Sequence, residues 1–139
     1  MIRHIWTIVC SRSLIDEESQ NITLIDALEH ITIPSSFLKS HKINKLPLQL
    51  EVVTLWNKVE QKSKVTGRAI LKFLSPEDEV LEEQSYTIDL TEFNRSRTRI
   101  RVSNLPLTTT GIYHFCVYLE GEKKTWQECA KIPIQIEEV

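Results

Sequence analysis

Long apolar runs are missing from this chain of 139 residues, and so is a high glycine content. No segment approaches the roughly 18 consecutive apolar residues of a membrane-spanning helix, so we expect no contact with a membrane. The three glycines leave few positions for the tight loops that bind phosphate groups. The motifs Gly-x-Ser-x-Gly and His-Glu-x-x-His are also absent, and we therefore predict that the protein is not an enzyme and uses no cofactor.

An excess of one charge sign is lacking too. The formal net charge of -2 argues against a surface built throughout to bind nucleic acid. The three cysteines, Cys10, Cys116 and Cys129, cannot all pair within one chain, which favours reduced thiols. Residues 1–6 show no apolar signal region, and together with the free thiols this predicts a cytoplasmic location. The length suits a single domain over residues 1–139 that buries its own core.

The sequence is rich in apolar residues that recur at every second position. Between residues 112 and 119, one parity carries Tyr113, Phe115, Val117 and Leu119. A polar turn follows, and the apolar residues after it again share one parity: Trp126, Ala130, Ile132, Ile134 and Ile136. Two such segments around a turn predict a β-hairpin that packs on a core through one face.

Further strands are predicted at residues 2–10, 48–56, 65–74, 81–90 and 97–105. Residues 2–10 are apolar on both parities, which suits a strand that is covered on both faces or that contacts a partner through its outer face. Residues 13–20 are polar and predict a loop.

The segment at residues 21–33 fits two structures. We favour a strand with a bulge near Asp26 over a helical turn at residues 23–29, and we expect Pro34 to end the element. The connection that follows, at residues 35–46, has room for one helical turn.

The spacing of strands and turns predicts an all-β fold, a single antiparallel β-sandwich of about seven or eight strands with little helix, although a closed barrel suits the same spacing. Residues 111–115 resemble the Gly-x-Tyr-x-aromatic stretch that opens the penultimate strand of many immunoglobulin-like domains. The resemblance implies an immunoglobulin-like sandwich in which the hydroxyl of Tyr113 bonds to nearby backbone.

Several weak motifs, taken in order, resemble a bacterial family of small β-sandwich proteins of unknown function. The chain departs from that pattern at Ser11, where an acidic residue is usual, and at residues 35–46 and 94–101. The resemblance implies the fold but no reaction, cofactor or catalytic residue. The motifs are Cys10 followed by Asp16, residues 22–25 leading to Ile31 and Pro34, the turn at 76–81, and residues 105–107 leading to 111–117 and 120–122.

Four arginines, Arg95, Arg97, Arg99 and Arg101, recur at every second position. An extended chain places them on one face, where they can bind successive phosphates or an acidic partner. Arg95 can also belong to the preceding loop. We favour a solvated outer face whose arginines pair with acidic side chains, because no aromatic residue lies between them for base stacking. The candidate acidic partners are Asp89, Glu82 and Glu83.

A second cluster consists of His114, Cys116 and Cys129, which the predicted hairpin places close together. Such side chains can hold zinc, with His4, His30 or His41 as a fourth ligand. The spacing is not that of a known zinc module, so we favour half-buried thiols and a surface histidine.

The tryptophans bear on the function. Trp56 and Trp126 fall on the apolar parity of their strands and are predicted to lie in the core, whereas an exposed Trp6 would mark an interface. We predict a non-catalytic module that binds an unidentified protein or a second copy of itself. Its predicted contact residues are Trp6, Ile8, Arg97, Arg99 and Arg101. The alternatives are nucleic-acid or phosphate binding through Arg95–Arg101 and a metal or redox site at His114, Cys116 and Cys129.

Overall fold

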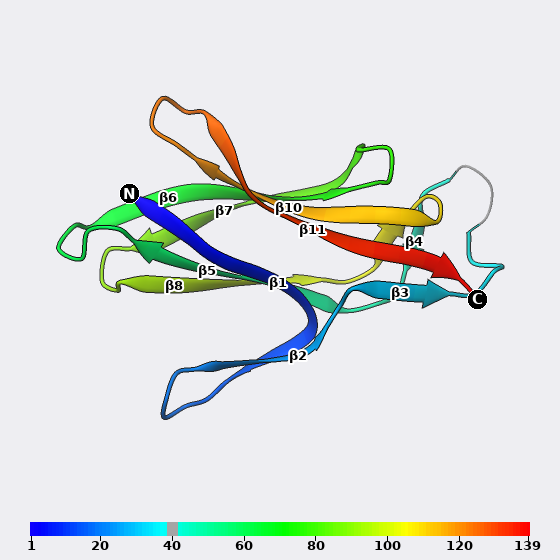
Figure 1. Cartoon of the computed structure of the whole chain (residues 1–139), viewed down its shortest axis with the longest axis horizontal. Coiled ribbons are helices and arrows are strands. Elements are labelled where there is room, and N and C mark those ends of the chain that lie inside the picture. The colour runs from blue at the N-terminus through cyan, green and yellow to red at the C-terminus, as the bar shows by residue number, and fades with distance from the viewer. Residues whose placement is uncertain (39–41) are drawn as a thin grey trace.

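A computed structural model describes residues 1–38 and 42–139, and these residues form eleven β-strands and no helix (Figure 1). The all-β prediction is therefore confirmed, and no helix long and apolar enough to cross a membrane occurs in the described residues. The strands are β1 (Ile2–Ile15), β2 (Ile22–Ala27), β3 (His30–Ile33), β4 (Asn44–Leu46), β5 (Leu50–Lys58), β6 (Val65–Leu74), β7 (Val80–Leu90), β8 (Arg95–Val102), β9 (Leu105–Leu107), β10 (Gly111–Glu120) and β11 (Trp126–Glu138).

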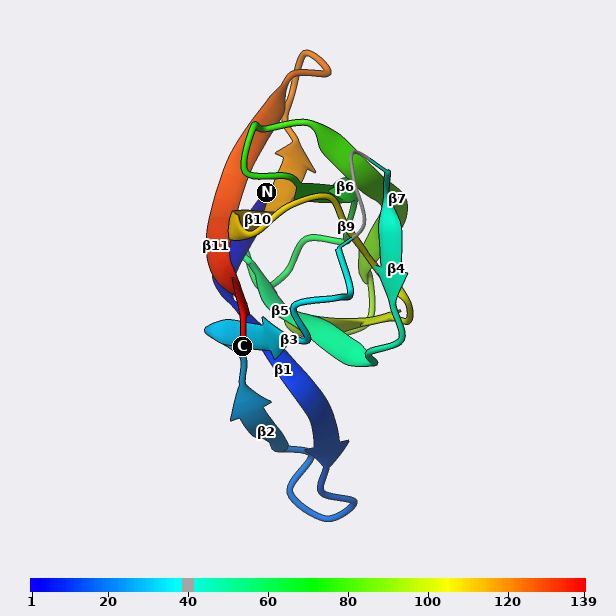
Figure 2. The same ribbon diagram turned by 90° about the vertical axis from the view of Figure 1, so that its right-hand side faces the viewer.

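The strands form two main sheets that face each other (Figure 2). Sheet A has the order β2-β1-β5-β8, and sheet B has the order β3-β11-β10-β6-β7. A short ladder joins β4 and β9. All pairs are antiparallel except β3 and β11, which run parallel, so the prediction of a purely antiparallel fold is wrong at this edge of sheet B. Sheet A is strongly curled, because β1 bends along its length (Figure 1).

The hydrophobic core lies between the two sheets and draws large side chains from both. Trp56 comes from sheet A, whereas Phe73, Tyr113 and Phe115 come from sheet B. Along β10, Tyr113, Phe115 and Val117 are buried as predicted, but Cys116 of the opposite parity is fully buried too. Burial of a side chain such as Phe115 contributes about 1.5–3 kcal/mol to folding.

Tyr113 makes the backbone hydrogen bonds that the immunoglobulin resemblance implied. Its hydroxyl accepts from the amides of Thr108 (2.9 Å) and Thr109 (3.0 Å), and it donates to the carbonyl oxygen of Thr109 (2.6 Å). The ring stacks on Phe73, with 5.4 Å between the ring centroids. One side chain thus fixes the loop before β10 to the core.

Trp126 does not lie in the core as predicted, because β11 contains a bulge. Val117 faces Ala130 across the hairpin, but Tyr118 faces Glu128, so Cys129 is an extra residue in β11. An extra residue reverses which parity points inward. Trp126 therefore points outward and is 40% exposed.

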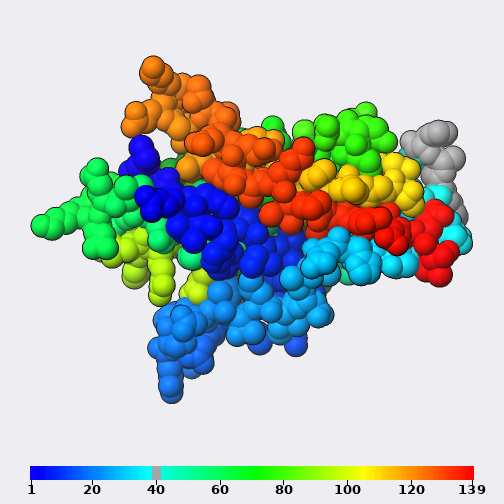
Figure 3. Space-filling model, in the orientation of Figure 1, coloured from blue at the N-terminus to red at the C-terminus, as the bar shows by residue number. Residues whose placement is uncertain are grey.

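The chain is more extended near its start than predicted. Residues 13–15 belong to β1 rather than to a loop, and they pair with β2. We call this hairpin, residues 11–27, the arm; Figure 3 shows it as a projection from the body of the molecule. Asp26 has a positive φ of 54°, at the predicted irregularity, and the prediction of strand over helix is confirmed.

Three of the eleven strands were not predicted, and each has a local cause. Residues 21–33 divide into β2 and β3, because the chain crosses from sheet A to sheet B at Leu28 and Glu29. The segment at 97–105 divides at Ser103 and Asn104, where Asn104 has a positive φ of 58°. Strand β4 lies in the connection at 35–46, whose residues 39–41, including His41, are outside the described part. Strand β3 ends just before Pro34, as predicted.

Candidate functional site

The outer face of sheet A carries all five predicted contact residues. The core-facing residues of β5 are Leu50, Val52 and Trp56, so the alternate residues of β5 and the residues opposite them point away from the core. The strand register aligns these outward residues in rows that run across β1, β5 and β8. The rows are Trp6–Leu55–Arg97, Ile8–Val53–Arg99 and Cys10–Glu51–Arg101.

The arm covers part of this outer face. Cys10 and Val53 are fully buried although they are separate from the main core, and Glu51 is only 5% exposed. Ser13, on the arm, donates a hydrogen bond from its Oγ to Oε2 of Glu51. Arg99 donates to Ser13 twice, from Nε to the hydroxyl (2.8 Å) and from Nη2 to the backbone carbonyl (3.0 Å). We call these five residues, Cys10, Ser13, Glu51, Val53 and Arg99, the arm cluster.

Glu51 balances the charge of two arginines. Its carboxylate lies 3.7 Å from Nε of Arg99 and 3.5 Å from Nε of Arg101. A buried carboxylate is tolerated when opposite charges and hydrogen bonds compensate for lost hydration, and Glu51 has both. Sequence reasoning missed Glu51, because nothing in the sequence shows that β5 pairs with β8.

The acidic partners that the sequence suggested for these arginines are wrong. Asp89, Glu82 and Glu83 lie on β7, which belongs to sheet B, whereas the arginines lie on β8 of sheet A. Glu83 instead pairs with Lys72 at 3.6 Å, and Asp89 accepts hydrogen bonds from Thr91.

The surroundings of Cys10 favour its neutral thiol over the thiolate, although Arg99 acts in the opposite direction. Burial raises the pKa of Cys10, and the negative charge of Glu51 raises it further. A thiol needs a lowered pKa to act as a nucleophile at neutral pH, so Cys10 is set up as a packed side chain.

The arm covers the other end of the outer face less completely. Trp6 and Leu55 are only half-buried there, and Arg97 donates a hydrogen bond to the carbonyl oxygen of Gln20. Phe93, just before β8, is 70% exposed. A groove of about 540 Å³ lies beside it, lined by Gln20 and residues 93–97. We call this region the open end; it consists of Arg3, Trp6, Gln20, Leu55, Asn57 and residues 93–97.

The open end has unpaired polar groups. Asn57 lies between Arg3 and Arg95 in the ladder, and its Oδ1 is buried without a hydrogen-bond partner among the described residues. Neither Arg3 nor Arg95 has a carboxylate of the described residues within ion-pair distance. Positive charge, apolar surface and an unsatisfied acceptor therefore occur together.

The predicted metal ligands are spread over both sides of the β10–β11 hairpin. His114 and Cys116 share the outward parity of β10, whereas Cys129 is the bulge residue of β11 and packs against the core. Burial lowers the pKa of His114 and raises the pKa of both thiols. Within residues 1–38 and 42–139, no three His, Cys, Asp or Glu side chains are placed to hold one metal ion.

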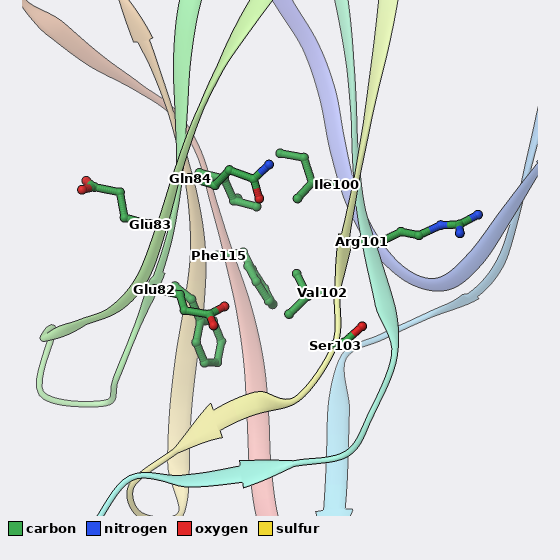
Figure 4. Close-up of a pocket in the computed structure, with 10 residues that line it drawn as sticks. Glu82, Glu83, Gln84, Ile100, Arg101, Val102, Ser103 and Phe115 are labelled. Atoms are coloured by element: carbon green, nitrogen blue, oxygen red, sulfur yellow. The ribbon is translucent and has the colours of Figure 1, made fainter.

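A cleft of about 360 Å³ opens between the edges of the two sheets, where β7 and β8 face each other (Figure 4). Its lining includes the core residues Phe73 and Phe115 and the inward-pointing Ile100 and Val102 of β8. Figure 4 shows that Arg101 points away from this cleft, toward the outer face of sheet A.

Comparison with protein-family models and with curated proteins identified no relative of this chain. No protein-family model matches the sequence, and no curated protein matches it significantly. The resemblance to a bacterial family of small β-sandwich proteins therefore stays a prediction from the sequence.

Proposed function

We propose that the protein is a non-catalytic interaction module that binds a protein partner, or a second copy of itself, through the open end of sheet A. One observation carries the proposal: Trp6 lies in register with Leu55 and Arg97, in a half-buried row beside the exposed Phe93. Tryptophan and arginine are the residue types most often found at energetic hot spots of protein interfaces. Arg3 and Arg95, which have no ion-pair partner in residues 1–38 and 42–139, add a polar rim to this apolar centre.

An immunoglobulin-like β-sandwich is the scaffold we propose for this surface. Two facing sheets and the hydrogen-bonded Tyr113 support it. The same architecture serves many unrelated functions, so the proposal rests on the surface and not on the fold.

The contacts of Arg95, Arg97, Arg99 and Arg101 favour a protein as the binding partner over a nucleic acid. Arg99 and Arg101 are already paired with Glu51, and Arg97 is bonded to Gln20. Only Arg95 of the four is then without a partner among the described residues, which is little charge for a chain of phosphates. The raised pKa values of Cys10 and Cys116 also argue against a nucleophilic thiol.

The test compares Trp6→Ser with Trp126→Ser, a matched control at the 40% exposed tryptophan of the other hairpin. The mass of each purified protein would be measured by sedimentation, and proteins captured from the parent lysate would be compared after a high-salt wash. We expect Trp6→Ser to remove self-association or the salt-resistant captured protein, and Trp126→Ser to retain them.

Equal behaviour of the two variants would contradict the proposal. Loss of all captured material at high salt, with nucleic acid in the eluate, would instead favour the arginine row as a phosphate-binding site.

A further inference from the structure

Strand β8 lies at the edge of sheet A. In the described residues β8 pairs only with β5. The amide of Lys58 donates to the carbonyl of Asn94 (3.0 Å), so the even-numbered residues of β8 direct their backbone groups toward β5. In an antiparallel strand, the backbone N–H and C=O groups of successive residues point to opposite sides of the strand. Those of Arg95, Arg97, Arg99 and Arg101 therefore point to the open edge.

The two faces of this edge differ in chemistry. On the outer face stand the four arginines, with Glu51 as the only carboxylate in ion-pair contact with them in the described part of the chain. On the inner face, Ile100 and Val102 border the cleft whose lining includes Phe73 and Phe115 (Figure 4). A strand added beside β8 would meet positive charge on one side. On the other side it would meet a cleft whose lining combines apolar side chains with Glu82, Glu83 and Gln84 of β7.

We propose that the free edge of β8 binds an extended acidic segment of a partner protein as an added antiparallel strand. This inference rests on the proposed interaction function and names its partner class. Residues opposite the arginines would be acidic, and the alternate residues would be apolar and fill the cleft. Strand addition draws its affinity from main-chain hydrogen bonds and its specificity from the alternating side chains.

The arginines contribute unequally to this binding. Arg99 is occupied by Ser13 and Glu51 and serves to hold the arm. Arg95 has no ion-pair partner in the described residues, and the side chain of Arg101 is 79% exposed although it lies near Glu51. Acidic residues are therefore most favoured opposite Arg95 and Arg101, at the two ends of β8.

A second copy of the chain is a poor occupant of this edge. Antiparallel pairing of β8 with itself places arginine opposite arginine on one face, and like charges directly opposite each other are destabilising. Nucleic acid is also disfavoured, because a sugar-phosphate backbone cannot form the main-chain hydrogen bonds that the open edge of β8 offers. The arginines thus disfavour self-pairing, and an acidic strand is favoured chiefly by Arg95 and by the exposed Arg101.

The first experiment uses three eight-residue probe peptides and the full-length protein. One alternates Glu and Val, one alternates Lys and Val, and one has the Glu/Val composition in the order Glu-Glu-Val-Val. Binding would be measured by fluorescence anisotropy, and amide protection by hydrogen-exchange NMR. We expect the alternating Glu/Val peptide to bind at least about tenfold more tightly than either other peptide.

Hydrogen exchange gives the sharper readout. Bound peptide should protect the amides of Arg95, Arg97, Arg99 and Arg101, whereas those of Ser96, Thr98 and Ile100 are already protected by β5. Binding without this alternating protection would overturn strand addition. An eight-nucleotide oligothymidylate serves as the nucleic-acid probe. If it binds as tightly as the alternating Glu/Val peptide, and the peptide cannot displace it, the choice of an acidic protein segment is wrong.

A charge-reversal pair tests the position of the peptide. Arg95→Glu should weaken Glu/Val binding roughly three- to tenfold and improve Lys/Val binding. Arg68→Glu, at an exposed arginine of β6 that pairs with Glu120, is the matched control and should change neither. Equal losses in both variants would show a non-local charge effect and overturn the site.

The two proposals fail in different ways. If the peptides do not bind while Trp6→Ser still removes assembly, the interaction surface stands and strand addition at β8 is wrong. If alternating protection is seen while Trp6→Ser changes nothing, β8 is a binding edge and the Trp6 row is not the contact surface.

Discussion

Two buried regions lie on opposite faces of sheet A, and they are stabilised by different interactions. The main core between the sheets is apolar, with Trp56 and Phe115 among its largest side chains. The arm cluster on the outer face contains a buried carboxylate, Glu51, that is bonded to Ser13 and Arg99. The first region depends on apolar area and shape, and the second depends on hydrogen bonds and charge.

The comparison shows where the molecule can change shape without unfolding. Apolar burial acts across the whole interface of the sheets, so the main core is lost only when the domain unfolds. The arm cluster attaches one hairpin to one sheet, and such local contacts can open at a lower free energy than global unfolding. The proposed contact surface lies beside the arm cluster, and its shape therefore depends on whether the arm is closed.

The largest effect is expected from Phe115→Ala, which removes a buried ring from the main core. We expect a loss of about 3–5 kcal/mol in the free energy of unfolding, since the truncation leaves a cavity. Urea denaturation followed by tryptophan fluorescence measures the loss. Trp126→Ala is the control, because that exposed ring should cost less than about 0.5 kcal/mol. Similar losses in both variants would contradict the assignment of Phe115 to the core.

Glu51→Gln breaks the arm cluster, and we expect it to lower the free energy of unfolding by about 2 kcal/mol. The variant keeps an acceptor for Ser13 but leaves Arg99 without its charge partner, and Arg99 is partly solvated, which limits the loss. The matched control is Glu83→Gln, whose surface pair with Lys72 contributes less than about 1 kcal/mol.

The same variant distinguishes local from global opening. Reaction of Cys10 with a thiol reagent should become faster in Glu51→Gln, because the thiol is less covered and its pKa loses the contribution of Glu51. Cys116 lies on β10 of sheet B, away from the arm, so its reaction rate in Glu51→Gln should stay close to the rate in the original protein. Parallel acceleration at both thiols would show that the arm does not open separately.

Tyr113→Phe tests the hydrogen bonds that join the Tyr113 hydroxyl to the backbone of the loop before β10. We expect a loss of about 1–2 kcal/mol, because the amides of Thr108 and Thr109 lose their acceptor while the ring stays packed. Thermal and urea unfolding measure the change. A variant as stable as the original protein would mean that water replaces the hydroxyl at no cost.

The smallest effect concerns His4, whose ring packs on Trp56 and bonds to Thr7 at 2.7 Å. Burial lowers the pKa of His4 below the usual value of a histidine side chain. The unfolded chain then binds a proton more readily than the folded one, so stability is full above the unfolded pKa and falls as the pH drops toward the folded pKa. His4→Gln should reduce the loss of stability between pH 7.5 and 5.5 without removing it, because burial also lowers the pKa of His114. An unchanged pH dependence would contradict the assignment.

The sequence predicted the local structure well where alternation was regular. Strand β6 has the predicted bounds, and Tyr113 and Phe115 point inward as expected. It was wrong for Trp126, since the bulge at Cys129 leaves no mark in the apolar pattern that distinguishes it from a regular strand. It placed Arg95 to Arg101 on one face but gave them the wrong acidic partners, because strand order is not encoded in strand pattern.

The sequence by itself determined that the chain forms strands and which residues of most strands face the core. The physical reason is that side chains alternate along an extended backbone, so a period of two is readable within one segment. Only the tertiary structure decided that β5 lies between β1 and β8. That pairing joins segments far apart in the chain, and it alone brings Trp6, Glu51 and the arginines to one face.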